Sequence, residues 1–348
     1  MREVVSAEGP WQKPARMVES ALSYEATPRP PRLPLSKLGQ AVTAATIGVV
    51  LFGAIVRITG SGAGCGQHWP SCNGEVAHLP QRLETWIELG HRTTSGLDFL
   101  GVLALAVVAW QRLSPRHPAR IAAVAAFVLI MVEVLIGARL VLLNLVGSNM
   151  SFDRAVVMPA HLVTTSLLIG SLAAASYFSS ERRVVALADL SASERAQLRG
   201  ALGWLLGAAA LLLVVSMTGA ITALGDTVYP VQGSTALEHV QHDQAAGAHF
   251  LGKMRVVHPL LALLGVAGLW IAGSRARAFE REPRIARWGG ALYAGGGLAL
   301  LIGVSNIWLG APGYLQVVHL LMACLLWLAV VVLGAMLWDA QRNNEAKQ

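Results

Sequence analysis

The sequence WIELGHR, at residues 86–92, places a carboxylate and an imidazole at the start of a long apolar run. Glu88 and His91 stand three residues apart, and residues at this spacing share one face of a helix. The apolar residues continue to position 110, which predicts a helix that carries both side chains near one end. Burying such a pair on an apolar helix costs free energy unless other groups pair with it, so we expect partners for both side chains elsewhere in the chain.

Eight apolar runs of this kind predict an integral membrane protein with an all-α fold. The 348 residues are 54% hydrophobic and only 14% charged, whereas soluble domains carry about 25% charged residues. A helix that spans a bilayer needs about 20 mostly apolar residues. The runs that meet this requirement are 38–58, 87–110, 121–143, 156–178, 201–224, 255–273, 289–311 and 314–338.

Basic residues predict the orientation of these helices. The two tails and the connections after the second, fourth and sixth runs together hold 20 of the 27 Lys and Arg residues. Cytoplasmic loops carry the excess of such residues, so both termini are expected in the cytoplasm, with the protein in the plasma membrane if the cell is bacterial. Because the basic residues are dispersed over several loops, without aromatic residues between them, the partner is expected to be the lipid bilayer and not nucleic acid.

Tails, helices and links divide the chain into five parts. Residues 1–37 are polar and proline-rich, which predicts a flexible cytoplasmic tail, and they place the first helix too late for a cleaved signal peptide. Residues 38–178 and 201–338 are expected to form two four-helix halves, joined by a cytoplasmic linker at 179–200 and followed by a C-terminal tail at 339–348.

Similar motifs in the two halves indicate an internal duplication, which is common in membrane proteins. The corresponding positions are Thr59-Gly60 with Thr218-Gly219, His91 with His258, Glu133 with Asn306, and His161 with His319. The fold class predicted is therefore two pseudo-repeated four-helix bundles. Asp98 and Glu133 are expected to find partners inside the bundle, because ionisable groups in hydrocarbon are costly.

Four histidines enter the apolar runs near the outer ends of the even-numbered helices. They are His91, His161, His258 and His319. Even-numbered helices all run from outside to inside, so the four imidazoles share one depth, two in each half. A lone intramembrane histidine is as often structural, but four at duplicated positions favour ligands of a metal or a haem. Haem is favoured over zinc, since zinc takes three or four ligands in a tetrahedron, whereas a helix bundle accommodates a planar cofactor.

The three cysteines predict one disulfide in the first outer loop and one buried residue in the last apolar run. Cys65 and Cys72 lie in the first outer loop, where the surroundings are oxidising, so a disulfide is expected, with free or redox-active thiols as the alternative. Cys324, in the last run, is expected to be a small buried apolar residue.

Five basic side chains near the outer surface are candidates to bind haem propionates. They are Arg57, Arg92, Arg139, Lys253 and Arg255. Snorkelling toward water would explain any single one of them. Glu88 also has two interpretations, an interfacial carboxylate or a group beside the first-half cofactor. Because Arg255 stands three residues before His258, where the first half has the acid, the first half is expected to perform chemistry and the second to carry electrons.

In these residues the chain resembles the haem A synthase family. The motifs are TGSGAGC and WPSCNGE in the first outer loop, IELGHR in the second helix, AHL in the fourth, HPLL in the sixth, and NIWLGAP followed by HL in the last two. The resemblance covers all eight predicted helices and leaves out the tails. It implies an eight-helix, internally duplicated protein that oxidises a methyl group of haem O to the formyl group of haem A.

The resemblance also implies roles for individual residues. The first-half pair, His91 and His161, would bind the substrate haem O, with Glu88 essential for the oxidation. The second-half pair, His258 and His319, would bind a permanent haem b that relays electrons. The two outer-loop cysteines would form a disulfide; a second cysteine pair of some relatives has no counterpart here. Haem O synthase, cytochrome oxidase assembly factors and a second copy of the chain are the protein partners implied.

Two other functions use the same histidines. A di-haem b electron carrier needs the four ligands but not Glu88, and a haem carrier would release its haem unchanged. If both first-half histidines stay bound, the substrate iron has no open position for oxygen. Either one histidine then leaves, or electrons are withdrawn from the macrocycle and water attacks the oxidised methyl carbon, with Glu88 taking a proton or stabilising positive charge.

Overall fold

The structure is a computed structural model that describes residues 34–75, 79–184, 187, 189–230 and 235–342. Most of the expected N-terminal tail and the last six residues of the chain lie outside the described residues. The chain separates into Met1–Pro34 and Leu35–Gln348, and the described helices lie in the second unit.

In the described part of the chain, eight helices are long and apolar enough to cross a membrane, so the protein is an all-helical, multi-pass membrane protein, as predicted. They are α1 (Leu35–Ile58), α2 (Leu83–Arg112), α3 (Pro118–Leu142), α4 (Phe152–Phe178), α5 (Ala192–Val228), α8 (Val257–Arg277), α9 (Pro283–Trp308) and α10 (Gly313–Gln341). Short helices in the connections are η1 (Ser61–Ala63), α6 (Ala236–Gln244), α7 (Phe250–Lys253) and η2 (Met254–Val256). The last two lead into α8, and together they form the span Phe250–Arg277.

Most helices extend past the apolar runs that predicted them, and polar residues cap the added turns of α3, α4, α5 and α9. Helix α5 begins at Ala192, inside the stretch 179–200 that was expected to be a linker. The Ser191 hydroxyl accepts the N–H of Glu194, and the Glu194 carboxylate accepts the N–H of Ser191 at 2.7 Å. This capping box satisfies backbone donors at the helix start, so the helix begins well before its apolar part.

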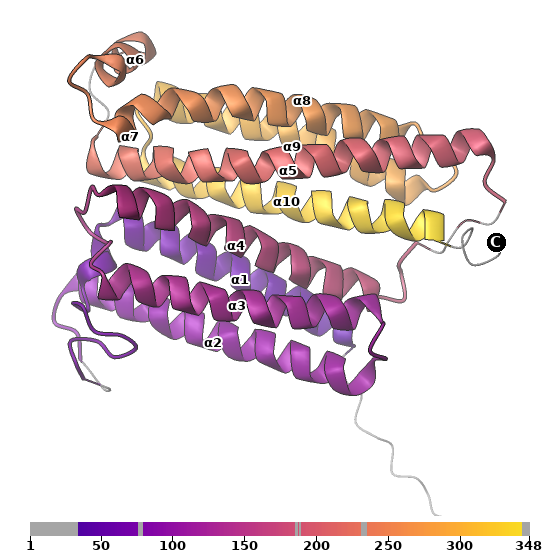
Figure 1. Ribbon diagram of the computed structural model, residues 1–348, viewed down its shortest axis with the longest axis horizontal. Coiled ribbons are helices and arrows are strands. Elements are labelled where there is room, and N and C mark those ends of the chain that lie inside the picture. The colour runs from indigo at the N-terminus through magenta and orange to yellow at the C-terminus, as the bar shows by residue number, and fades with distance from the viewer. Residues whose placement is uncertain (1–33, 76–78, 185–186, 188, 231–234, 343–348) are drawn as a thin grey trace, which may run out of the picture. The chain divides into compact units, whose positions relative to one another are not determined.

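The eight spans pack as two closed groups of four (Figure 1). In the first group α1 contacts α2 and α4, and α3 contacts the same two helices. In the second, α5 contacts α8 and α10, and α9 contacts the same two. The groups meet through contacts of α4 with α5 and α10, and of α1 with α10, so α10 borders both groups.

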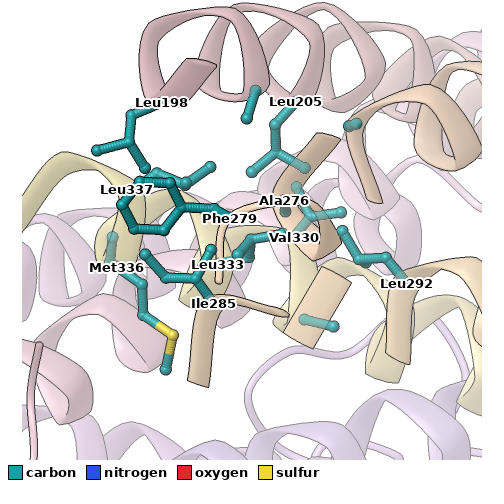
Figure 2. Packing of buried hydrophobic residues seen from close by; sticks show 14 of the residues in the cluster. Leu198, Leu205, Ala276, Phe279, Ile285, Leu292, Val330, Leu333, Met336 and Leu337 are labelled. Carbon is teal, nitrogen blue, oxygen red and sulfur yellow. The ribbon is translucent and has the colours of Figure 1, made fainter. Parts of the chain in front are cut away.

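The largest buried cluster lies inside the second group, where leucines of α5 and α10 meet residues of α9 (Figure 2). Leu198 and Leu205 of α5 are buried there with Leu333 of α10 and Leu292 of α9. A smaller cluster joins the groups and contains Ile47 of α1, Ile169 of α4 and Cys324 of α10. Cys324 is buried, as predicted.

Candidate functional site

The outer loop after α1 is closed by a disulfide between Cys65 and Cys72, which confirms that prediction. The sulfur atoms are 2.03 Å apart, and both residues are buried. The loop also contacts α2, since the Thr85 hydroxyl donates to the carbonyl oxygen of Gly64 at 2.9 Å. The disulfide loop therefore lies against the first turns of α2, which carries Glu88 and His91.

Glu88 is only 3% exposed, and its carboxylate binds α2 to the disulfide loop. Oε2 accepts the backbone N–H of Cys65 at 2.7 Å, while Oε1 accepts from Nη2 of Arg92. Arg92 in turn donates from Nη1 to the carbonyl oxygens of His68 and Ser71, both at 2.7 Å. The helix-face argument had placed Glu88 beside His91 only; its loop partners were not predicted, because they come from a segment 23 residues earlier.

His91 packs against α1 at Gly53, a residue without a side chain. Its ring meets Phe52 edge-on, with ring centroids 5.7 Å apart. A Cβ on Gly53 would stand 3.2 Å from Cε1 of His91, closer than ordinary contact. Nδ1 of His91 is buried and has no hydrogen-bond partner among the described residues.

His161 of α4 faces a carboxylate of α3. Oε2 of Glu133 lies 2.7 Å from Nδ1 of His161. Thr165 donates its hydroxyl to the same oxygen at 2.8 Å, and Thr164 donates to Oε1. Glu133 therefore has partners inside the bundle, as expected, although the sequence did not identify them. Asp98, the other expected case, accepts the hydroxyl of Thr46 at 2.9 Å.

In the second half, His258 of α8 and His319 of α10 face one another. Their ring centroids are 6.3 Å apart, and the rings are nearly perpendicular at 86°. Nδ1 of His258 lies 3.1 Å from the carbonyl oxygen of Val215, whereas Nδ1 of His319 is buried without a partner among the described residues. Glycines again adjoin the rings: a Cβ on Gly219 would stand 3.0 Å from Cε1 of His258, and one on Gly303 3.4 Å from Cε1 of His319.

These distances fit two imidazoles that share one iron. A metal–imidazole bond is about 2 Å long, so two of them in line across an iron put the ring centroids roughly 6 Å apart. The observed 6.3 Å between His258 and His319 agrees with this value. The first-half pair stands on helices that pack in a similar arrangement, because α2 and α4 both contact α1 and α3.

The glycines beside the histidines were only partly recognised from the sequence. Thr218-Gly219 had been matched with Thr59-Gly60, but Gly60 follows the end of α1, with φ of 68° and nothing near its Cβ position. Gly219 lies inside α5, beside His258. Gly53 is the residue of α1 that has the same relation to His91. A search for glycines on odd-numbered helices at the depth of the histidines could have found it.

Three of the five basic candidates are occupied by protein groups. Arg92 binds Glu88 and the disulfide loop, as described. Arg57 donates from Nη1 to the carbonyl oxygen of Ala223 at 2.6 Å and to Thr227, and from Nη2 to Oε1 of Gln316 at 2.8 Å. These bonds connect α1 with α5 and α10 near the end of α1 that leads into the disulfide loop.

Arg255 also binds protein groups, whereas the remaining two candidates are exposed. Arg255 pairs with Asp226 at 2.8 Å and with Asp243 at 2.7 Å. Arg139 and Lys253 are exposed, and within the described residues their side chains have no hydrogen bond or ion pair. The structure thus leaves Arg139 and Lys253 free to bind an external carboxylate.

In the described part of the chain, eight helices able to span a membrane, four of which carry the histidines, define a multi-pass membrane protein. The sequence profile of the cytochrome oxidase assembly protein family (COX15-CtaA) matches residues 37–331. The chain therefore belongs to this family, in agreement with the resemblance read from its motifs.

Individual relatives carry two different names. A protein of Thermus thermophilus named protoheme IX farnesyltransferase is 44% identical over 291 residues, which are 82% of this chain and 45% of that protein. The chain thus spans about half the length of this relative. The heme A synthases of Alkalihalophilus pseudofirmus and Shouchella clausii match shorter stretches: 44% identity over 90 residues (26% of this chain, 30% of the relative) and 38% over 104 residues (30% and 35%).

Proposed function

We propose that the protein is a haem A synthase, an oxidoreductase that converts a methyl group of haem O to the formyl group of haem A. The observation that carries this proposal is the buried carboxylate of Glu88, one helical turn before His91. A protein that only carries electrons or haem needs no such group, and the second half has Arg255 at the corresponding place. Family membership and the heme A synthase relatives support the same activity.

We assign the two histidine pairs different roles. The half 38–178 would bind the substrate haem between His91 and His161, and the half 201–338 would bind haem b between His258 and His319. When bound, haem b supplies one-electron chemistry. Its ligands are supported by the 6.3 Å between the two rings.

We further propose that the halves are repeats, joined at 179–200, with both termini in the cytoplasm. The glycines beside the histidines support the repeat, because 38 residues separate Gly53 from His91 and 39 separate Gly219 from His258. In each half, a glycine in the first helix of that half therefore lies next to the first histidine.

Within the substrate site, Arg92 and the N–H of Cys65 hold the carboxylate of Glu88 from two sides, so its position beside His91 is fixed. From that position it would stabilise positive charge that develops nearby or receive a proton from water. Arg139 and Lys253 would bind propionates, since both are exposed and without protein partners in the described structure.

Haem O synthase would be the partner that supplies the substrate, and cytochrome oxidase assembly factors would receive the product. The name of the Thermus thermophilus relative supports the first partner, since it describes farnesyl transfer to protohaem IX in a protein of which more than half lies outside the match. That name belongs to the whole relative, so the matched part need not perform the transfer.

The test is to extract the pigments of the purified protein, expressed with a source of haem O, and to separate them by reversed-phase chromatography. Wild type should yield haem A.

Glu88→Gln should retain haem but lose about 100-fold or more of the product, the usual contribution of a proton-transferring group. Glu84→Gln, one turn earlier on α2 and with a side chain 46% exposed, is the matched control and should leave the yield unchanged. Unmodified haem O from wild type would indicate a haem carrier, and haem b alone an electron carrier.

A further inference from the structure

Glu133 is a carboxylate in the membrane-spanning part of the first half, and its partners are polar groups of α4. Its side chain is only 12% exposed. Oε2 contacts Nδ1 of His161 and accepts from Thr165, and Oε1 accepts from Thr164. The proposed oxidation gives this residue no role, yet it contacts one of the proposed ligands directly.

We infer that Glu133 is a positioning residue that orients His161 through Nδ1 and makes it a stronger electron donor than the second-half ligands. The inference rests on the proposed function, because it takes His161 to be a haem ligand. A neutral imidazole has one N–H and one acceptor nitrogen, and an ionised carboxylate only accepts. With a carboxylate oxygen 2.7 Å away, Nδ1 therefore carries the hydrogen, and Nε2 keeps the lone pair that binds a metal. A carboxylate in this position fixes the ring and raises its basicity.

Among the described residues, no carboxylate contacts the ring of His258 or His319 in the second half. Nδ1 of His258 lies beside the carbonyl oxygen of Val215, at 3.1 Å, which is a neutral acceptor. The position that corresponds to Glu133 in the proposed repeat is Asn306, also neutral. The polar surroundings of a ligating histidine are one of the means by which a protein sets a haem's potential. A more basic ligand stabilises ferric over ferrous iron, so the first-half site should have the lower reduction potential.

The experiment loads the full-length purified protein with iron protoporphyrin IX and measures the midpoint potentials of both haems by optical redox titration. His161→Ala identifies the first-half haem as the one that loses its low-spin spectrum. Glu133→Gln should raise the potential of that haem alone, by about 59 mV for each tenfold change in its ferrous-to-ferric ratio. The matched control is Asp98→Asn, the same acid-to-amide change in the same half, beside Thr46 and not beside a histidine. It should move neither potential.

A second variant keeps the inference testable if Glu133→Gln does not fold. Thr165→Val removes the hydroxyl that shares Oε2 with His161, so the carboxylate should interact with His161 more strongly and the same potential should fall. Unchanged potentials in Glu133→Gln, or equal shifts of both haems, would overturn the inference while the ligand assignment stands. If His161→Ala leaves both haem spectra intact, the assignment in the proposed function is wrong and the inference falls with it.

Discussion

At the scale of the residue, three glycines determine where the imidazoles lie. Gly53, Gly219 and Gly303 each stand where a Cβ would come within 3.0 to 3.4 Å of a histidine ring. The backbone of the neighbouring helix thus takes the place of a side chain, and each ring packs directly on it. Protein interiors are close-packed, so one added carbon at such a place has to move something.

Gly53→Ala should therefore displace His91. The new Cβ would be 3.2 Å from Cε1 of the ring, so we expect binding of iron protoporphyrin IX to the first half to weaken at least about tenfold, measured by titration of the Soret band. Gly48→Ala is the control on the same helix, because nothing lies within 4 Å of its Cβ position. It should leave binding intact and stabilise α1 by up to about 1 kcal/mol. Equal binding by both variants would contradict the close contact.

The sequence predicted some of these residues and missed others for a physical reason. Histidines on apolar helices and cysteines in one loop are conspicuous because polar or reactive groups are rare there. The contact of Glu88 with Cys65 and that of Glu133 with His161 join residues 23 and 28 positions apart. Helix periodicity assigns a residue to a face of its own helix, and it contains no information about which atom of another element lies opposite.

At the scale of the element, hydropathy located all eight spans but not their ends. Apolar residues record the part of a helix that lies in hydrocarbon, whereas capping by residues such as Ser191 and Glu194 determines where the helix starts. The connection between groups of helices was also not predicted, because Arg57 was expected either to bind a propionate or to snorkel toward water. In the structure it joins α1 to α5 and α10.

Arg57→Met should loosen this junction. The methionine keeps the apolar stem but leaves the acceptors on Ala223 and Gln316 without their donor, and bonds from a charged donor contribute about 1.5–3 kcal/mol each. We expect a lower midpoint of thermal unfolding, measured by tryptophan fluorescence in detergent. Arg199→Met, on the exposed surface of α5, is the matched control and should unfold like wild type. If the two variants unfold alike, the junction does not stabilise the fold.

At the scale of the whole molecule, the distribution of basic residues makes a prediction about sidedness. The sequence assigns 20 of the 27 Lys and Arg residues to the tails and to the connections after the second, fourth and sixth apolar runs. If these parts face the cytoplasm, a green fluorescent protein fused after residue 348 should fold and fluoresce there. Alkaline phosphatase fused after residue 148, between α3 and α4, should be active outside it. An active phosphatase at the C-terminus would reverse the proposed orientation, and with it the side on which the histidines lie.

The position of α10 between the two groups has a consequence for biosynthesis. Trp327 of α10 donates its indole N–H to the carbonyl oxygen of Ser166 on α4 at 2.5 Å, and Cys324 is buried against α1 and α4. Yet α10 follows the other seven spans in the chain, so the ribosome synthesises it only after they have been made. Until then the surfaces of α1 and α4 that contact it face lipid or an insertion chaperone, so the second group and its junction with the first are completed late, by a single helix.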